Sequence, residues 1–132
     1  MNGLTALESQ VIQMLLSGDD EALLVLREQA QQATVSSREI TGVGFFTEFT
    51  IPPEAPRING CPTFTLCDVN GSATNVRHGL GFVLFVTDGA LEMLEGYTYD
   101  EPWPDEISGL ALMYSTGESR NLEDLKKAIR AG

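Results

Sequence analysis

The chain has 132 residues, of which 42% are hydrophobic, and a formal net charge of −11 at pH 7. This length suits a single domain, residues 1–132, that needs neither a metal ion nor a disulfide to be stable. The acidic charge argues against nucleic-acid binding, which requires clustered Lys and Arg, and no stretch reaches the roughly 18 apolar residues of a membrane span.

The first part of the chain predicts two helices. Apolar residues recur at intervals of three and four between residues 4 and 15, and again between residues 21 and 33. Thr5 and Glu8 have the spacing of a capping box at the start of the first helix. Gln29 falls between the apolar positions of the second helix and is expected to face water. The short connection between the two helices predicts an αα-hairpin.

Alternating apolar residues then predict strands. Residues 39–51 alternate with Phe45 and Phe49 on one side, which indicates one long strand. A short strand is expected at residues 64–69. It should end in a two-residue turn at Asn70–Gly71, because Asn-Gly is typical of such turns.

The clearest hairpin is predicted around Asp88–Gly89, which lies between two apolar runs. A type I′ turn needs positive φ at both central residues, and Asp and Gly tolerate that conformation. In the resulting register, Val86 lies opposite Leu91, and Leu84 lies opposite Met93.

A further strand is predicted at residues 108–115, and Asn121 is expected to cap a last helix. Leu122, Leu125 and Ile129 of that helix should face the core. The order of elements therefore predicts an α+β fold with an N-terminal helical hairpin, a mostly antiparallel sheet of about five strands and a C-terminal helix.

Cys61 and Cys67 are predicted to be free thiols. If residues 63–69 form a strand, the two Cα atoms lie about 20 Å apart, whereas a disulfide needs them within about 7 Å. Free thiols agree with a reducing compartment. The start of the chain also lacks the basic and apolar regions of a signal peptide, so we expect a cytoplasmic protein.

Residues 95–107, EGYTYDEPWPDEI, combine aromatic, acidic and proline residues. Pro102 and Pro104 fix the backbone on both sides of Trp103, so that a stiff segment holds the indole. Tyr and Trp side chains dominate the energy of protein interfaces. We therefore predict that Trp103 is at least half buried and that exposed carboxylates around it attract a basic protein partner. The predicted binding residues are Tyr97, Tyr99, Asp100, Glu101, Trp103, Asp105 and Glu106.

Other interpretations of this segment stay open. Trp103 can simply close one end of the sheet, with the acids keeping the surface soluble. The carboxylates and aromatic rings can also line a small-molecule pocket or the site of a weak hydrolase. A third alternative is a structural homodimer that forms through sheet edges.

Motifs for catalysis are missing from the sequence. There is no GxxxxGK phosphate loop and no GxSxG elbow. His78 is the only histidine, and no serine or cysteine motif accompanies it. Two cysteines and one histidine are too few for a closed zinc site without carboxylates. We therefore assign no catalytic residue, metal ligand or cofactor, and favour a non-enzymatic binding module.

Two segments, REITGVGFFTEF at 38–49 and GFVLFVTDGALEMLEGYTYDEPWP at 81–104, resemble a family of small bacterial proteins. Those proteins pair a "REyTGvGFfT" strand with an "LEGyTYdepWP" segment, and no activity is established for them. The resemblance implies a bacterial source and a small soluble domain. By its type, a small acidic α+β protein, the chain is also similar to the immunity proteins that bacteria make against toxins.

Overall fold

The computed structural model describes residues 3–117 and 120–131 of the chain. In chain order, the elements are α1 (Ala6–Leu15), α2 (Glu21–Gln32), β1 (Thr34–Ile40), β2 (Gly44–Thr50), β3 (Phe64–Leu66), β4 (Val69–Ala73), β5 (Val76–Thr87), β6 (Ala90–Thr98), β7 (Ala111–Tyr114) and α3 (Leu122–Ala131). The predicted α+β class, with two helices before the sheet and one after it, is confirmed.

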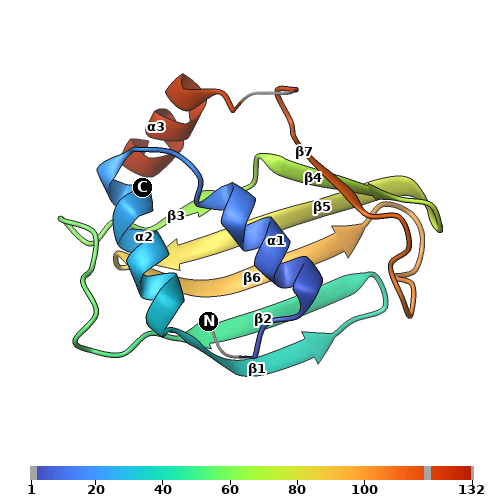
Figure 1. The fold of residues 1–132 in the computed structure, drawn as a ribbon, viewed down its shortest axis with the longest axis horizontal. Coiled ribbons are helices and arrows are strands. Elements are labelled where there is room, and N and C mark those ends of the chain that lie inside the picture. Colours follow the sequence, from blue (N-terminus) through green and yellow to red (C-terminus); the bar gives the residue numbers. More distant parts are fainter. Residues whose placement is uncertain (1–2, 118–119, 132) are drawn as a thin grey trace.

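All the described strands belong to one antiparallel sheet in the order β1-β2-β6-β5-β4-β7, and β3 pairs with the second half of β5. The helices α1 and α2 lie across one face of this sheet, and α3 lies at the end near β3 (Figure 1). No helix of the described chain covers the opposite face. We call that opposite side the open sheet face.

The core lies between the helices and the covered face of the sheet. Phe45 in β2, Phe82 in β5 and Leu94 in β6 point from the sheet towards the helices and are buried. Val11 of α1 and Leu26 of α2 meet them and are fully buried. Each such side chain contributes about 1.5–3 kcal/mol through the apolar surface that it removes from water.

Within the described residues the sheet has seven strands, whereas about five were predicted. The run 39–51 is not one strand, because a turn over residues 41–43 divides it between β1 and β2. The Thr41 N–H closes this turn by donating to the carbonyl oxygen of Gly44 at 2.8 Å. The prediction that Phe45 and Phe49 point to the same side of a strand is nevertheless correct, since both lie on the buried face of β2.

The predicted turn at Asn70–Gly71 is wrong. Both residues lie inside β4, where Asn70 pairs with Gly81 of β5 on one side and with Met113 of β7 on the other. An internal strand with partners on both edges stabilises the extended backbone more than the local preference for a turn. The chain instead changes strand at residues 67–68, between β3 and β4.

The hairpin around Asp88–Gly89 is confirmed, with φ of 50° at Asp88 and 78° at Gly89. Val86 pairs with Leu91 as predicted, but the register then shifts by one residue at Glu92. Because of this bulge, Met93 pairs with Phe85 and turns to the open sheet face instead of the core.

The capping box at the start of α1 is confirmed. The Glu8 N–H donates to Thr5 Oγ1 at 3.1 Å, and the Thr5 N–H donates to Glu8 Oε1 at 2.8 Å. Glu8 is also buried, with 1% of its surface exposed, and its carboxylate accepts hydrogen bonds from Arg38 and Thr47. It therefore ties α1 to β1 and β2.

The expectation that Gln29 faces water is wrong, because its exposed fraction is 0%. Its Nε2 donates to the carbonyl oxygens of Pro56 at 2.8 Å and Gly89 at 2.9 Å. Its Oε1 accepts from the Leu91 N–H at 2.9 Å. One amide thus joins α2 to the loop before β3 and to the β5–β6 turn.

The remaining predictions concern the thiols and the last helix. Cys61 and Cys67 are free, as predicted, and both are exposed. Leu125 and Ile129 of α3 are buried, as expected, whereas the side chain of Leu122 lies outside the described residues.

None of the helices in the described ranges is both long and apolar enough to cross a membrane.

Candidate functional site

Residues 99–110 wrap around one end of the sheet, between β6 and β7. Asp100 has a φ of 53°, a left-handed conformation that Asp tolerates, and the chain turns there. The Trp103 N–H then donates to the carbonyl oxygen of Gly42 at 3.0 Å, which fixes the segment to the β1–β2 turn. On the far side, Asn75 Nδ2 donates to the carbonyl oxygen of Glu106 at 2.6 Å.

Glu101 holds this segment to the start of β5. Its Oε1 accepts from the Arg77 N–H at 3.0 Å, and its Oε2 accepts from the His78 N–H at 2.7 Å. These two donors, Arg77 first, outweigh the effect of burial and hold the pKa of Glu101 below its ordinary value. Glu101 thus anchors the loop, and its exposure is intermediate, whereas the prediction placed it on an exposed acidic rim.

Trp103 lies on the helix side of the sheet. Its ring meets Phe45 edge to face, with centroids 5.3 Å apart and an interplanar angle of 78°. The prediction that Trp103 is at least half buried is confirmed, and Asp105 and Glu106 beside it are exposed, as predicted.

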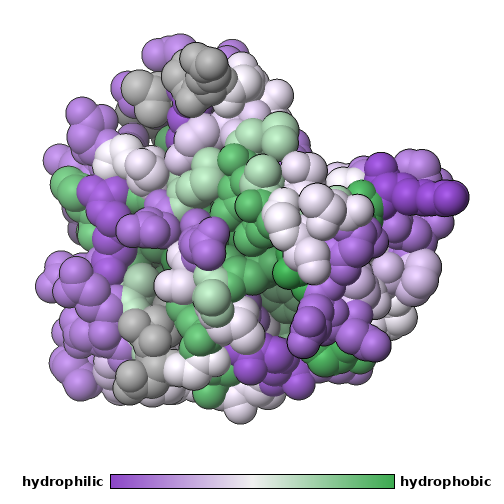
Figure 2. Space-filling view, turned by 45° about the vertical axis from the view of Figure 1, so that its right-hand side comes forward, coloured by the Kyte–Doolittle hydropathy of each residue, from purple (hydrophilic) through white to green (hydrophobic). Residues whose placement is uncertain are grey.

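An open groove of about 450 Å³ runs between Trp103 and the start of α1. Figure 2 shows the hollow on this side of the molecule, with hydrophobic side chains inside it and hydrophilic ones beside it. We call it the Trp103 groove. Its apolar lining consists of Ala6, Leu7, Ile40, Phe45, Trp103 and Ile107.

The charged residues of the Trp103 groove are unbalanced. Asp105 and Glu106 are exposed at its rim, and neither has a salt bridge within the described chain. Arg38 is the only base among the described lining residues, and its guanidinium binds the carboxylate of Glu8. The positive charge of Arg38 is therefore already matched, and the groove presents apolar surface beside two carboxylates.

Tyr97 and Tyr99 lie on the other side of the sheet. Gly96 faces Phe45, so the next residue in β6, Tyr97, points to the open sheet face, where its ring lies over Gly81. Tyr99 meets Tyr97 edge to face at 5.3 Å. A hydrogen bond with Tyr99, followed by burial, raises the pKa of Tyr97 to about 12.

The predicted binding residues therefore divide into three groups. Trp103, Asp105 and Glu106 meet at the groove. Tyr97 and Tyr99 lie across the sheet from them, while Asp100 and Glu101 form the turn between the two sides. The prediction missed Ile40, which is 65% exposed and lines the groove. The sequence gives no sign that β1 ends at Ile40, because the alternation of residues 39–51 continues without a break.

Replacing Trp103 with alanine should lower the free energy of unfolding by about 2 kcal/mol. The loss is smaller than the 3–5 kcal/mol typical of a fully buried Trp, because part of the indole is already in water. Urea unfolding of the variant measures it. Tyr99→Ala is the control, since Tyr99 is 42% exposed and should lose below about 1 kcal/mol. Equal losses in the two variants would contradict the packing described for Trp103.

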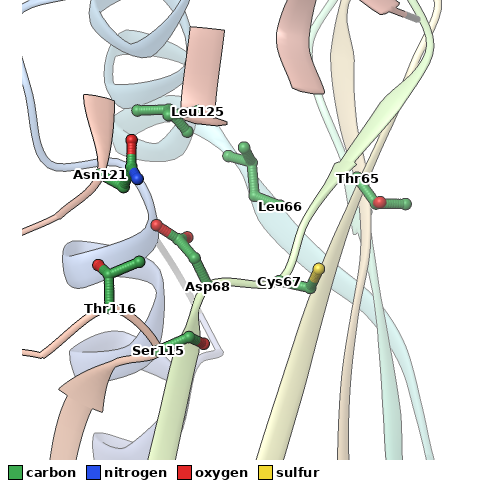
Figure 3. A pocket seen from close by; sticks show the side chains of 8 residues that line it. All are labelled: Thr65, Leu66, Cys67, Asp68, Ser115, Thr116, Asn121 and Leu125. Atoms are coloured by element: carbon green, nitrogen blue, oxygen red, sulfur yellow. The ribbon is translucent and has the colours of Figure 1, made fainter. Parts of the chain in front are cut away.

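A second hollow, of about 290 Å³, lies between the β3–β4 junction, the residues after β7 and α3. Figure 3 shows the Asp68 carboxylate reaching towards Asn121, while Thr65 points away from it. Asp68 accepts from Arg120 Nε at 2.7 Å, and Asn121 has its own interaction within the chain. These polar groups hold the start of α3 in place, so this hollow is the weaker candidate.

The described residues hold no group of three or more His, Cys, Asp or Glu side chains placed to bind a metal ion. His78 lies at the start of β5 with its side chain exposed, and its N–H is bonded to Glu101. Neither a family model, nor a curated protein, nor a solved structure matches the chain, so the resemblance of residues 38–49 and 81–104 to a bacterial family stays a prediction.

Proposed function

We propose that the protein is a non-enzymatic binding module whose Trp103 groove takes a basic segment of a partner protein. The observation that carries this proposal is the pairing of exposed apolar surface with unmatched negative charge. Ile40 is 65% exposed beside the Trp103 ring, and Asp105 and Glu106 stand at the rim. Exposed apolar surface next to charged groups of one sign is typical of protein-binding sites.

The groove favours a protein segment over a small molecule. A small-molecule site usually encloses most of its ligand, whereas this groove is open along its length. The fitting segment has one or two apolar side chains to cover Ile40 and the edge of Trp103. Lys or Arg residues flanking them would pair with Asp105 and Glu106. A bacterial, immunity-like role, in which the partner is a basic toxin domain, is one form of this proposal.

The test is a titration of ¹⁵N-labelled protein with two synthetic peptides that share apolar residues and differ only in Lys versus Glu flanks. The Lys peptide should shift the amide signals of Ile40 and Phe45 and the indole N–H signal of Trp103. The Glu peptide should leave them unchanged. Ile40→Ser should weaken binding of the Lys peptide by about tenfold, or about 1.4 kcal/mol.

Matched variants separate the groove from the general charge of the protein. Leu24, 50% exposed on α2, provides the apolar control, and Leu24→Ser should leave binding unchanged. The pair Asp105→Asn and Glu106→Gln should weaken binding and reduce its salt dependence. The pair Asp19→Asn and Glu28→Gln removes the same amount of charge far from the groove, so it should change neither the affinity for the Lys peptide nor its salt dependence. Equal losses from both pairs would mean that only the overall charge attracts the peptide.

A further inference from the structure

The open sheet face is a second surface, on the opposite side of the sheet from the Trp103 groove. In each strand, the residues between the core positions point to it, so β2, β5 and β6 place a run of large side chains there. The apolar and aromatic members are Phe46, Val83, Phe85, Met93 and Tyr97, all partly buried against one another.

The charges that β1, β2 and β6 place on this face have one sign. Glu39 of β1, Glu48 of β2 and Glu95 of β6 alternate onto it, around the apolar residues. Arg38 is the only base in β1, β2, β3, β6 and residues 81–87 of β5, and its side chain turns to the helix side to bind Glu8. Arg77 and His78 lie at the start of β5, outside this set. These strand residues thus give the face an apolar centre with carboxylates beside it, and their one base, Arg38, turns away from it.

The side chains at the centre of the face are held in place before anything binds. A Cβ atom at Gly81 would overlap the ring of Tyr97, so the glycine leaves room for this ring over β5. Tyr99 meets the same ring edge to face, with the two centroids 5.3 Å apart. Ser37 Oγ donates to Glu48 Oε2 at 2.9 Å and orients that carboxylate. A surface ordered in this way loses little side-chain entropy when a partner covers it.

We propose that the open sheet face is a docking surface for a basic protein, separate from the Trp103 groove. Charge complementarity selects this occupant. Nucleic acid and anionic membranes would bring negative charge against Glu39, Glu48 and Glu95. A second copy of the chain, placed face to face, would set the same carboxylates against each other, and like charges in direct contact destabilise an interface. A partner with an apolar centre and Lys or Arg around it satisfies both features.

The test is a selection from a displayed library of a three-helix scaffold. Positions on one helix face are randomised among Lys, Glu, Leu, Tyr and Ser, with Lys and Glu at equal frequency. Clones are then sorted for binding to the wild-type chain. The recovered clones should carry more Lys than Glu. Most should lose binding by about tenfold on Glu48→Lys and keep it on Glu28→Lys, which makes the same charge change on an exposed residue of α2.

Other outcomes would overturn the inference. The open sheet face does not dock basic proteins if the clones bind the Glu48→Lys variant as tightly as the wild type. The same conclusion follows if Glu28→Lys lowers their affinity as much as Glu48→Lys does. If nearly all clones lose binding only on Ile40→Ser, they bind the Trp103 groove and the open sheet face is rejected as a docking surface. The opposite pattern supports the open sheet face and leaves the groove to be tested by the peptide titration. Sedimentation that shows a wild-type dimer, made monomeric by Phe46→Ser, would make a second copy the occupant instead.

Discussion

Replacing Gln29 with leucine should lower the free energy of unfolding by about 2–4 kcal/mol. Leucine has a similar volume, so the loss does not come from a cavity. It comes mainly from the buried N–H of Leu91, which loses its acceptor. The carbonyl oxygens of Pro56 and Gly89 each lose one donor, but Pro56 is exposed and Gly89 keeps the N–H of Ile58 at 3.2 Å. Each buried group left without a hydrogen bond costs about 1–3 kcal/mol.

Urea unfolding measures this loss, and Gln31→Leu is the matched control on the same helix. Gln31 is exposed, so its replacement should change stability by less than about 0.5 kcal/mol. Amide hydrogen exchange gives a second measurement, because the Leu91 N–H should lose its protection in Gln29→Leu. If both variants are equally stable, the buried amide of Gln29 does not hold α2 to the hairpin.

Replacing Glu8 with glutamine should lower the free energy of unfolding by about 2–4 kcal/mol at neutral pH. The substitution keeps the size of the side chain and removes its charge. Arg38 then lacks an ionised partner, and removing one member of a buried pair is strongly destabilising. The side chain of Arg38 is 29% exposed, so water compensates part of the loss. Glu28→Gln, on an exposed position of α2, should have little effect.

The effect of Glu8 should depend on pH in a defined direction. Burial alone would raise the pKa of Glu8, but hydrogen bonds from Arg38, Thr47 and the Thr5 N–H, with the charge of Arg38, hold it below its ordinary value. Because the folded-state pKa is the lower one, the stabilisation is complete above the unfolded-state pKa and is lost as the pH falls through the folded-state value.

Urea midpoints of the wild type and Glu8→Gln, measured between about pH 7 and about pH 3, check this direction. The difference between the two proteins should be largest at neutral pH and should shrink in acid. A difference that stays constant or grows as the pH falls would show that the charge of Glu8 does not stabilise the fold.

Local signals explain which parts of the fold could be predicted. The Asp88–Gly89 hairpin and the Thr5–Glu8 capping box depend on residues close together in the chain, and both are confirmed. The β1–β2 turn was missed because residues 41–43 continue the alternation of their neighbours, so sequence pattern alone does not distinguish them from a strand. The bulge at Glu92 likewise leaves no local mark, yet it turns Met93 out of the core.

The buried polar residues and the division of the site depend on distant partners. Gln29 and Glu8 resemble ordinary surface residues of amphipathic helices, and their hydrogen-bond partners come from other elements of the fold. The stiffness of the segment around Trp103 could be predicted from its prolines. Its path around the end of the sheet could not, because the N–H groups of Arg77 and His78 hold Glu101 there.

Two exposed thiols allow copies of the chain to be cross-linked under oxidising conditions. Cys61 and Cys67 are free and accessible, and no disulfide within the chain protects them. In a reducing compartment they stay thiols. In the presence of an oxidant such as dissolved oxygen, a thiol of one copy and a thiol of another can each lose a proton and an electron and form an intermolecular disulfide. Such a covalent dimer needs no complementary surface, and a reductant dissociates it.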